Sequence, residues 1–236
     1  VNTTVTSVTT TSREAYTRDN KEVQALMEKL EPAEDFYRVE KKTRKTKNDG
    51  AWMNFPSVSL FSSTANADLT KFFKRMGCEA STNAYSITGS TPLVDSLLSV
   101  RYALYSEYIP NTDLVNYIQE SGGTYLYENL YTLPLGFVLP YDLADNWQYQ
   151  MENPAEVQND LCLLLGTDDV LVPVETEVSG SGCTFTADMA GEYYVYIQNK
   201  KVKNVKASLP SGEKNFSNVD RGYLLELGYC AAGEMV

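Results

Sequence analysis

The chain has 236 residues, of which 43% are hydrophobic and 22% charged, and its formal net charge is −11. This length and composition are typical of a globular protein with one large domain or two small ones. The acidic balance argues against a nucleic-acid partner, which needs a basic face, and the absence of histidine removes the commonest general base and a common zinc ligand.

The amino-terminal segment, residues 1–18, is polar and threonine-rich, and it predicts an extended or disordered lead-in. It lacks the apolar core of a signal peptide. The whole chain contains no run of 18 apolar residues, so we expect no membrane-spanning helix. Residues 19–30 predict the first helix, capped by Asp19 or Asn20 and ended by Pro32.

A strand is predicted in "DFYRVEKK", residues 35–42, and it runs into the basic stretch "KKTRKTK", residues 41–47. Such a stretch can contact phosphates or anionic lipid headgroups. Its position directly after a strand favours a solvated strand end or loop.

Three consecutive hydroxyl residues, Ser62–Thr64, precede a helix that is predicted to be capped by Asn66 and to end at Gly77. A serine nucleophile here would need Lys71 or Lys74 as its base, because the chain has no histidine. No nucleophile or phosphate-loop motif surrounds the serines. We therefore expect a strand-to-helix bend.

A third helix is predicted to start at Thr91 and Pro92, and a strand follows from Val100. Asp95 lies within this apolar run. It is either a catalytic carboxylate or, as is commoner, a first-turn acid that favours the helix dipole.

A hairpin is predicted around residues 121–123, followed by a further strand over residues 135–140. The clearest helix signal comes next: Asn153 caps, Pro154 takes the first helical position, and Gly166 closes the helix.

The carboxyl-terminal part has no helical periodicity and consists of strand-length pieces between turn signals. These features predict a mixed α+β or α/β fold: a first domain over residues 19–170, built on a mixed sheet with flanking helices, and an antiparallel β-sandwich-like, jelly-roll-like unit over residues 171–236 that is short for a complete sandwich. The turn signals lie at residues 190–191, 199–200, 210–212 and 232–233.

The four cysteines form no C-x-x-C pair, so no metal site and no cofactor is predicted. Cys162 lies among leucines and is expected to be buried. A Cys183–Cys230 disulfide is an open alternative for an extracellular segment.

Aromatic residues supply the main indication of a binding role, because sugars stack on aromatic rings beside polar groups. The alternative is that tyrosine is favoured in half-buried strands. The carbohydrate-contacting candidates are Tyr125, Tyr127, Tyr131, Tyr141, Trp147, Tyr149, Glu128 and Asn129, with Asp142 and Asp145 nearby.

Six stretches, in order, resemble the extracytoplasmic part of YfhO-family bacterial membrane proteins, over residues 35–236. They are "FYRVE", "SLFSSTANADLTKFFKRMG", "PLVDSLLSVRYAL", "YLYENLYTLPLGFVLP", "NPAEVQNDLCLLLG" and "YLLELGYCAAGE". One departure is Ser99, which stands where the family pattern has glycine in a turn.

The resemblance implies a soluble domain at the extracytoplasmic face of the bacterial cell membrane. The parent would be a polytopic protein similar to C-type glycosyltransferases, which modify cell-envelope polymers such as lipoteichoic acid. The catalytic carboxylate would lie in the transmembrane portion of the parent chain, so no catalytic residue is expected here. The implied partners are that transmembrane portion and an envelope polysaccharide or lipid-linked sugar. Alternatives are a secreted carbohydrate-binding or adhesion module and a stand-alone hydrolase.

Overall fold

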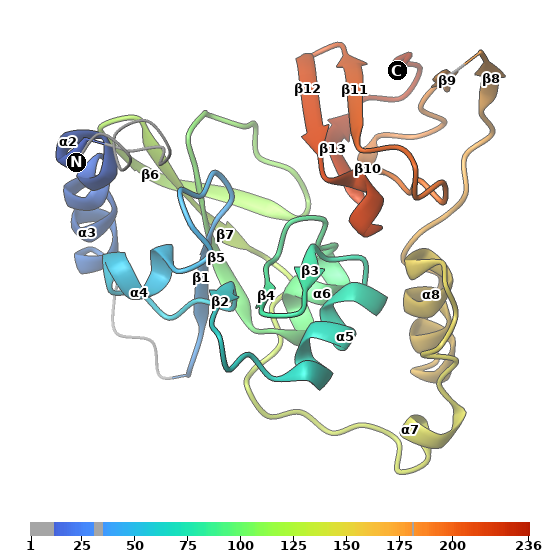
Figure 1. Cartoon of the computed structure of the whole chain (residues 1–236), viewed down its shortest axis with the longest axis horizontal. Helices are drawn as coiled ribbons and strands as arrows, with labels where there is room; N and C mark the ends of the chain where they lie inside the picture. The colour runs from blue at the N-terminus through green and yellow to red at the C-terminus, as the bar shows by residue number, and fades with distance from the viewer. Residues whose placement is uncertain (1–11, 31–34, 181) are drawn as a thin grey trace, which may run out of the picture.

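The computed structural model describes residues 12–30, 35–180 and 182–236. Helices combine with several mixed and antiparallel sheets, which confirms the predicted α+β mixture. A first unit with the largest sheet lies to the left in Figure 1, and a smaller all-β unit lies at the upper right.

The predicted lead-in is only partly described, since residues 1–11 lie outside the described residues. Within it, Arg13–Thr17 form a short helix, α2, so the extended conformation predicted there is wrong. The Ser12 side chain accepts a hydrogen bond from the Ala15 amide, a cap that stabilises the first turn.

A four-stranded mixed sheet with the order β1-β5-β7-β6 is the centre of the first unit. β1 runs parallel to β5, and the other neighbours are antiparallel. Gly122 and Gly123 both have positive φ and close the predicted β6–β7 hairpin. The strands are β1 (Arg38–Lys41), β5 (Val100–Tyr105), β6 (Val115–Ser121) and β7 (Thr124–Asn129).

Two helices, α3 (Asn20–Glu28) and α4 (Asp49–Met53), pack with this sheet. α3 confirms the first predicted helix; its N-cap is Asp19, and Pro32, predicted to end it, lies outside the described residues. Leu26 is completely buried against sheet residues such as Leu104, which explains the apolar helix face seen in the sequence.

The basic stretch at residues 41–47 forms the end of β1 and a loop, as predicted, but only part of it is solvated. Lys42 is mostly buried beside Asp95. The Arg44 guanidinium donates hydrogen bonds to Ser59, Ser86 and Thr88. These cations turn inward because acidic and hydroxyl groups from distant parts of the chain line the interior there.

A second layer follows, with a small sheet of order β2-β4-β3 and two helices. The caps are those predicted: the Asn66 side chain accepts from the amides of Asp68 and Leu69, and Thr91 accepts from Val94. Ser62–Thr64 form the predicted bend. The elements are β2 (Leu60–Phe61), α5 (Ala67–Arg75), β3 (Ala80–Ser81), β4 (Ala84–Tyr85) and α6 (Pro92–Leu97).

A long connection leads from β7 to α7 (Leu143–Asn146) and α8 (Pro154–Leu164). The strand predicted at residues 135–140 is wrong: this segment has no regular structure and is exposed. Pro134 and Pro140 lack amide donors, and the segment pairs with no strand among the described residues.

The helix α8 has the predicted Asn153 cap, a buried Cys162 and a Gly166 with φ of +74° after its end. Its fully buried Gln158 donates to the Met76 carbonyl and accepts from the Thr91 hydroxyl, which ties α8 to the ends of α5 and α6.

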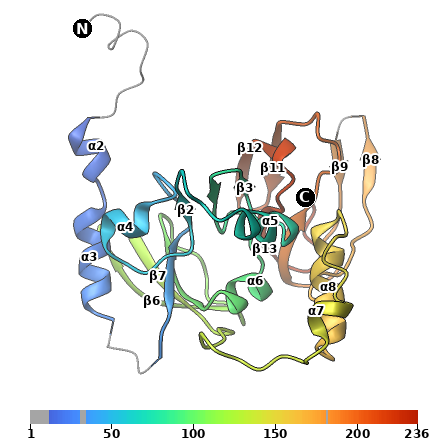
Figure 2. The ribbon, with the colours of Figure 1, turned by 60° about the horizontal axis from the view of Figure 1, so that its bottom comes forward.

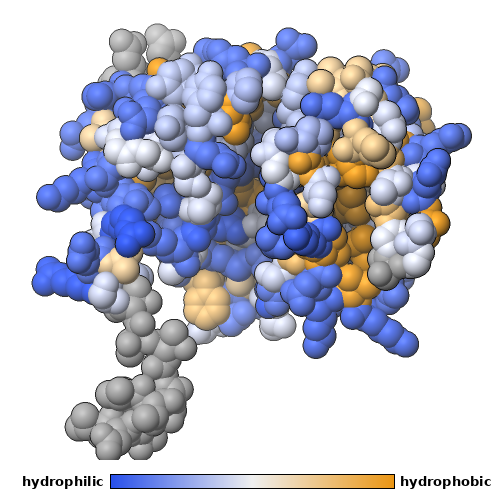
Figure 3. Space-filling model, turned by 90° about the horizontal axis from the view of Figure 1, so that it is seen from above, coloured by the Kyte–Doolittle hydropathy of each residue, from blue (hydrophilic) through white to orange (hydrophobic). Residues whose placement is uncertain are grey.

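The second unit consists of antiparallel strand pairs, β8–β9, β11–β12 and β10–β13, rather than two complete sheets. The predicted turn at residues 210–212 closes the β11–β12 hairpin. Figure 3 shows hydrophobic surface gathered over this end of the molecule. The elements are β8 (Glu177–Ser179), β9 (Gly182–Thr184), β10 (Gly191–Val195), β11 (Asn204–Leu209), β12 (Gly212–Ser217), the 3₁₀ helix η1 (Val219–Arg221) and β13 (Leu225–Cys230).

The segment before β13 contacts the first unit, beside which it lies in Figures 1 and 2. The Leu224 amide donates to the Gly77 carbonyl at 2.8 Å. Arg221 forms a 2.6 Å ion pair with Glu79. The alternative of a Cys183–Cys230 disulfide is not realised: both thiols are free, one exposed and the other buried.

Candidate functional site

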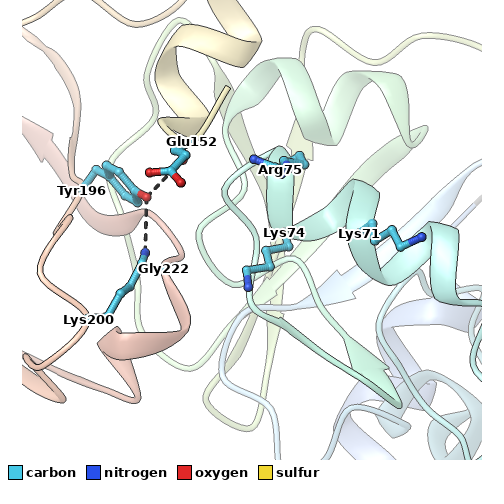
Figure 4. A pocket seen from close by; sticks show the side chains of 7 residues that line it. All are labelled: Lys71, Lys74, Arg75, Glu152, Tyr196, Lys200 and Gly222. Carbon is cyan, nitrogen blue, oxygen red and sulfur yellow. Dashed lines mark hydrogen bonds between the residues drawn. The ribbon is translucent and has the colours of Figure 1, made fainter. Parts of the chain in front are cut away.

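A cleft with a volume of about 250 Å³ lies where α5, the segment before α8 and the second unit meet. Figure 4 shows its lining. Four of the seven lining residues carry a positive charge and one is acidic, although the whole chain is strongly acidic. The lining residues are Lys71, Lys74, Arg75, Glu152, Tyr196, Lys200 and Gly222. We call this feature the basic cleft.

One side of the basic cleft is the polar face of α5. Lys74 and Arg75 follow Lys71 by three and four residues, so both lie on the same helix face as Lys71. Phe73 and Met76 are buried on the opposite face. The amphipathic pattern that packs α5 onto the core thus also sets its basic side chains toward the cleft.

Arg75 is held in place by the backbone in front of α8. Its Nη1 donates to the carbonyl oxygens of Gln150 and Met151 at 2.9 and 2.8 Å. Because both acceptors are neutral, the guanidinium keeps its full positive charge at the edge of the cleft.

The other side of the cleft comes from the second unit. The Tyr196 hydroxyl donates to the Glu152 carbonyl at 3.1 Å and accepts from Lys200 Nζ at 3.4 Å. The ammonium also lies 5.3 Å from the Tyr196 ring centroid, a cation–π distance. Tyr196 therefore positions Lys200 while anchoring the second unit to the first.

The charge of the basic cleft is largely unbalanced. Lys71 pairs with Asp68 at 3.2 Å on the exposed surface. For Lys74, Arg75 and Lys200, no ion pair is found within the described ranges. Three cations without carboxylate partners around one hollow favour an anionic ligand.

The size of the cleft limits what it holds. Its volume is below the roughly 300–1,000 Å³ of pockets that enclose drug-sized ligands. A single phosphate or carboxylate group, with the remainder of a larger molecule in solvent, suits both the volume and the charge.

A separate buried cluster lies at the junction of the two units. Lys42 Nζ is 3.7 Å from Asp95 Oδ2 and 3.6 Å from Glu226 Oε1. Burial raises the pKa of Asp95 to about 6, although Lys42 acts in the opposite direction. Burial also raises the pKa of Glu192 to about 7, with Glu226 adding to the effect. Asp95 lies in the first turn of α6, as the commoner of the two predicted roles requires, and it also forms a buried ion pair with Lys42.

Four of the carbohydrate-contacting candidates lie on β7, where they are largely committed to other contacts. Tyr127 is completely buried, and its hydroxyl bonds both the amide and the carbonyl of Ile109. Glu128 pairs with Arg101 at 2.9 Å. Asn129 is buried and donates to the Val100 carbonyl. Tyr125 is half-buried, and its ring lies edge-on to that of Tyr108.

The remaining candidates lie elsewhere. Tyr131 and Tyr141 belong to the long connection after β7, the first half-buried and the second fully exposed. Trp147 and Tyr149 form an aromatic pair with centroids 5.0 Å apart, and Trp147 Nε1 donates to the Val157 carbonyl. The eight residues thus occupy three places and are not brought together in one groove.

Sequence reasoning did not identify the basic cleft. The spacing of Lys71, Lys74 and Arg75 was an available signal, since it marks one helix face. Lys200 lies more than a hundred residues further along the chain, and no sequence pattern connects it to α5.

Comparison with known proteins assigns the chain to a family. The family model described as "Bacterial membrane protein YfhO" matches residues 1–180. No curated protein and no solved structure matches the chain. Within the described part of the chain, every helix is too short or too polar to cross a lipid bilayer.

Proposed function

The chain belongs to the YfhO family of bacterial membrane proteins, and we propose that it is an extracytoplasmic accessory domain that positions an anionic acceptor for a membrane-embedded glycosyltransferase-like portion of its parent protein. The basic cleft supports this proposal: three cations without carboxylate partners surround a hollow in a protein with a net charge of −11.

The acceptor class that fits is a phosphate-rich envelope polymer such as lipoteichoic acid. Each repeat of such a polymer offers one compact anion, which matches a small cleft better than a large sugar-binding pocket would. The Lys71, Lys74 and Arg75 side chains supply one wall and Lys200 the other, so the polymer would run between the two units.

Catalysis is assigned to the membrane-embedded portion. The acidic residue at the cleft, Glu152, stands alone among basic side chains, whereas glycoside chemistry uses two facing carboxylates. We therefore expect the isolated chain to bind the acceptor without transferring or hydrolysing sugar.

The test is calorimetric titration of the 236-residue chain with polyglycerol phosphate and with an uncharged dextran. We expect saturable, salt-sensitive binding of the phosphate polymer alone. The double variant Lys74→Gln/Lys200→Gln should weaken this binding by about thirtyfold, because two phosphate contacts are lost at a cost on the order of 1 kcal/mol each.

Lys201→Gln is the matched control, since Lys201 is exposed next to Lys200 but does not line the cleft. An equal loss of affinity in the control and in the double variant would show that the polymer is attracted non-specifically by positive charge. Turnover of a sugar substrate by the chain alone would contradict the accessory role.

A further inference from the structure

The connection between β7 and α7 presents apolar side chains to solvent. Residues 129–141 contain no charged residue. Val138 is 98% exposed and Tyr141 fully exposed, so neither side chain packs on the remainder of the protein. The other exposed large hydrophobic residues of this stretch are Leu130, Leu135, Phe137 and Leu139. We call residues 133–141 the apolar loop.

The apolar loop is held at its ends and free between them. The Leu133 amide donates to the Ser96 carbonyl, and the Leu143 amide donates to the Pro140 carbonyl. Leu143 itself is buried in the core of the first unit. Within the described ranges, no hydrogen bond ties residues 135–139 to the remainder of the chain. The loop is therefore an anchored projection whose apolar side chains face outward.

A cluster of this kind on a protein surface indicates a partner, and membership of a membrane protein family favours a lipid bilayer as that partner. We propose that the apolar loop inserts into the interfacial layer of a phospholipid bilayer. Leu135, Val138 and Leu139 would reach the acyl boundary. Phe137 and Tyr141 suit the level of the headgroups, where aromatic rings are enriched.

The backbone sets the depth of insertion. Unpaired amide and carbonyl groups over residues 135–139 are costly in the hydrocarbon core but are satisfied by water and headgroups at the interface. The loop consequently lies at the boundary and does not span the bilayer.

Charge predicts which lipids matter. Asp142 and Asp145, both exposed, follow the loop directly, and the chain is acidic overall. Attraction to anionic lipids cannot drive the contact, so zwitterionic vesicles should bind at least as well as anionic ones.

The apolar loop lies on the side of the molecule opposite the described ends of the chain (Figures 1 and 2). The surface that it offers to a bilayer is therefore separate from the surface around those ends.

The test is flotation of the 236-residue chain with phosphatidylcholine vesicles, and with vesicles of equal parts phosphatidylcholine and phosphatidylglycerol. We expect the chain to float with both, and added salt not to release it. Val138→Asp should lower the floated fraction about fivefold or more, since a charge replaces an inserted apolar group. Val138 contacts little in the folded chain, so the variant should keep its circular dichroism spectrum.

Val178→Asp is the control, because Val178 is also highly exposed but lies on β8 in the second unit. Lys74→Gln/Lys200→Gln should float like the wild type, which separates lipid insertion from ligand binding in the basic cleft. Absence of flotation by the wild type, or an equal loss in Val178→Asp, would overturn the proposal. So would concentration-dependent self-association that Val138→Asp abolishes, because the loop would then contact a second copy of the chain.

Discussion

Lys42 Nζ lies 3.6 Å from Glu226 Oε1, and this contact joins the first unit to β13 of the second. Burial lowers the pKa of Lys42, but Glu226 and Asp95 outweigh it and raise the pKa well above its ordinary value. The lysine therefore stays charged in the interior. A residue that seemed part of a solvated basic stretch is a buried connection between the units.

Replacing this lysine should destabilise the protein. Lys42→Met leaves Asp95 and Glu226 without their cation, so we expect the free energy of unfolding to fall by about 2–4 kcal/mol. Urea denaturation measures this. Lys206→Met is the control, because the Lys206–Glu213 pair is more than half exposed on both sides and should contribute less than about 0.5 kcal/mol. Equal effects of the two variants would contradict the assigned role of Lys42.

The partly buried acid Glu192 should make stability depend on pH. Its pKa is raised from an ordinary 4.5 to about 7 by burial and then by Glu226, so the folded chain holds this proton more tightly than the unfolded chain does. The stabilisation is complete below pH 4.5 and is lost as the pH rises through 7. Glu192→Gln removes this loss. We expect its free energy of unfolding, relative to wild type, to increase by about 1–3 kcal/mol between acidic and mildly alkaline pH. A constant difference across that range would contradict the prediction.

Two glycines with nearly equal φ test the packing of the junction. Gly89 has φ of +82°, and a Cβ there would lie 2.5 Å from the Leu224 carbonyl oxygen and 2.6 Å from that of Gly77. Gly123 has φ of +81° and open space around its Cβ position. Both alanine variants suffer the same backbone strain of about 1 kcal/mol. Gly89→Ala should lower the free energy of unfolding by at least about 2 kcal/mol more than Gly123→Ala does, as measured by thermal or urea unfolding. A similar loss of unfolding free energy in both variants would show that the backbone around Gly89 shifts readily to make room for the added methyl group.

Ser99 is a site where substitution should stabilise the protein. It has φ of +54°, and its buried Oγ has no hydrogen-bond partner within the described residues. Ser99→Gly relieves the backbone strain and removes the unsatisfied hydroxyl, so we expect a gain of about 1 kcal/mol in unfolding free energy. Ser99→Ala removes only the hydroxyl and should gain less. If Ser99→Gly were less stable than Ser99→Ala, the left-handed backbone at residue 99 would not be a source of strain in the wild-type protein.

Trp147 should prove important for stability rather than only for binding. It packs against the cluster around α5 and α8 and donates to the Val157 carbonyl. Trp147→Ala should therefore cost about 2–3 kcal/mol in unfolding free energy, and Trp147→Phe about 1 kcal/mol, mostly the lost hydrogen bond. A loss of sugar binding in the alanine variant would need comparison with the phenylalanine variant. Unchanged urea midpoints in both would contradict this role.

Features set by neighbouring residues were predictable. The side chains of Asn66, Thr91 and Asn153 cap the helices that the sequence indicated, because a cap depends on a few adjacent residues. The strand predicted at residues 135–140 failed because apolar composition does not supply a partner edge. The β6–β7 hairpin succeeded because its two strands supply edges to each other across a short turn.

The candidate site was harder to predict from the sequence than the helix caps and the hairpin were. One wall of the basic cleft is a single helix face and carries a recognisable spacing at Lys71, Lys74 and Arg75. The other wall depends on how Tyr196 docks on the Glu152 carbonyl, a contact between distant segments. The aromatic residues that seemed to form one groove were separated for the same reason, since proximity along the chain does not bring side chains onto one surface.

The sequence by itself determined the capped helices and the hairpin turns, because helix periodicity, capping and turn chemistry act over a few residues. The tertiary structure alone decided where charge and apolar surface came to lie. It buried Lys42 beside Glu226, brought Lys200 to the basic face of α5, and left Val138 in solvent. Each of these outcomes depends on which distant groups are available to pair with or cover a side chain, and that is set only when the whole chain folds.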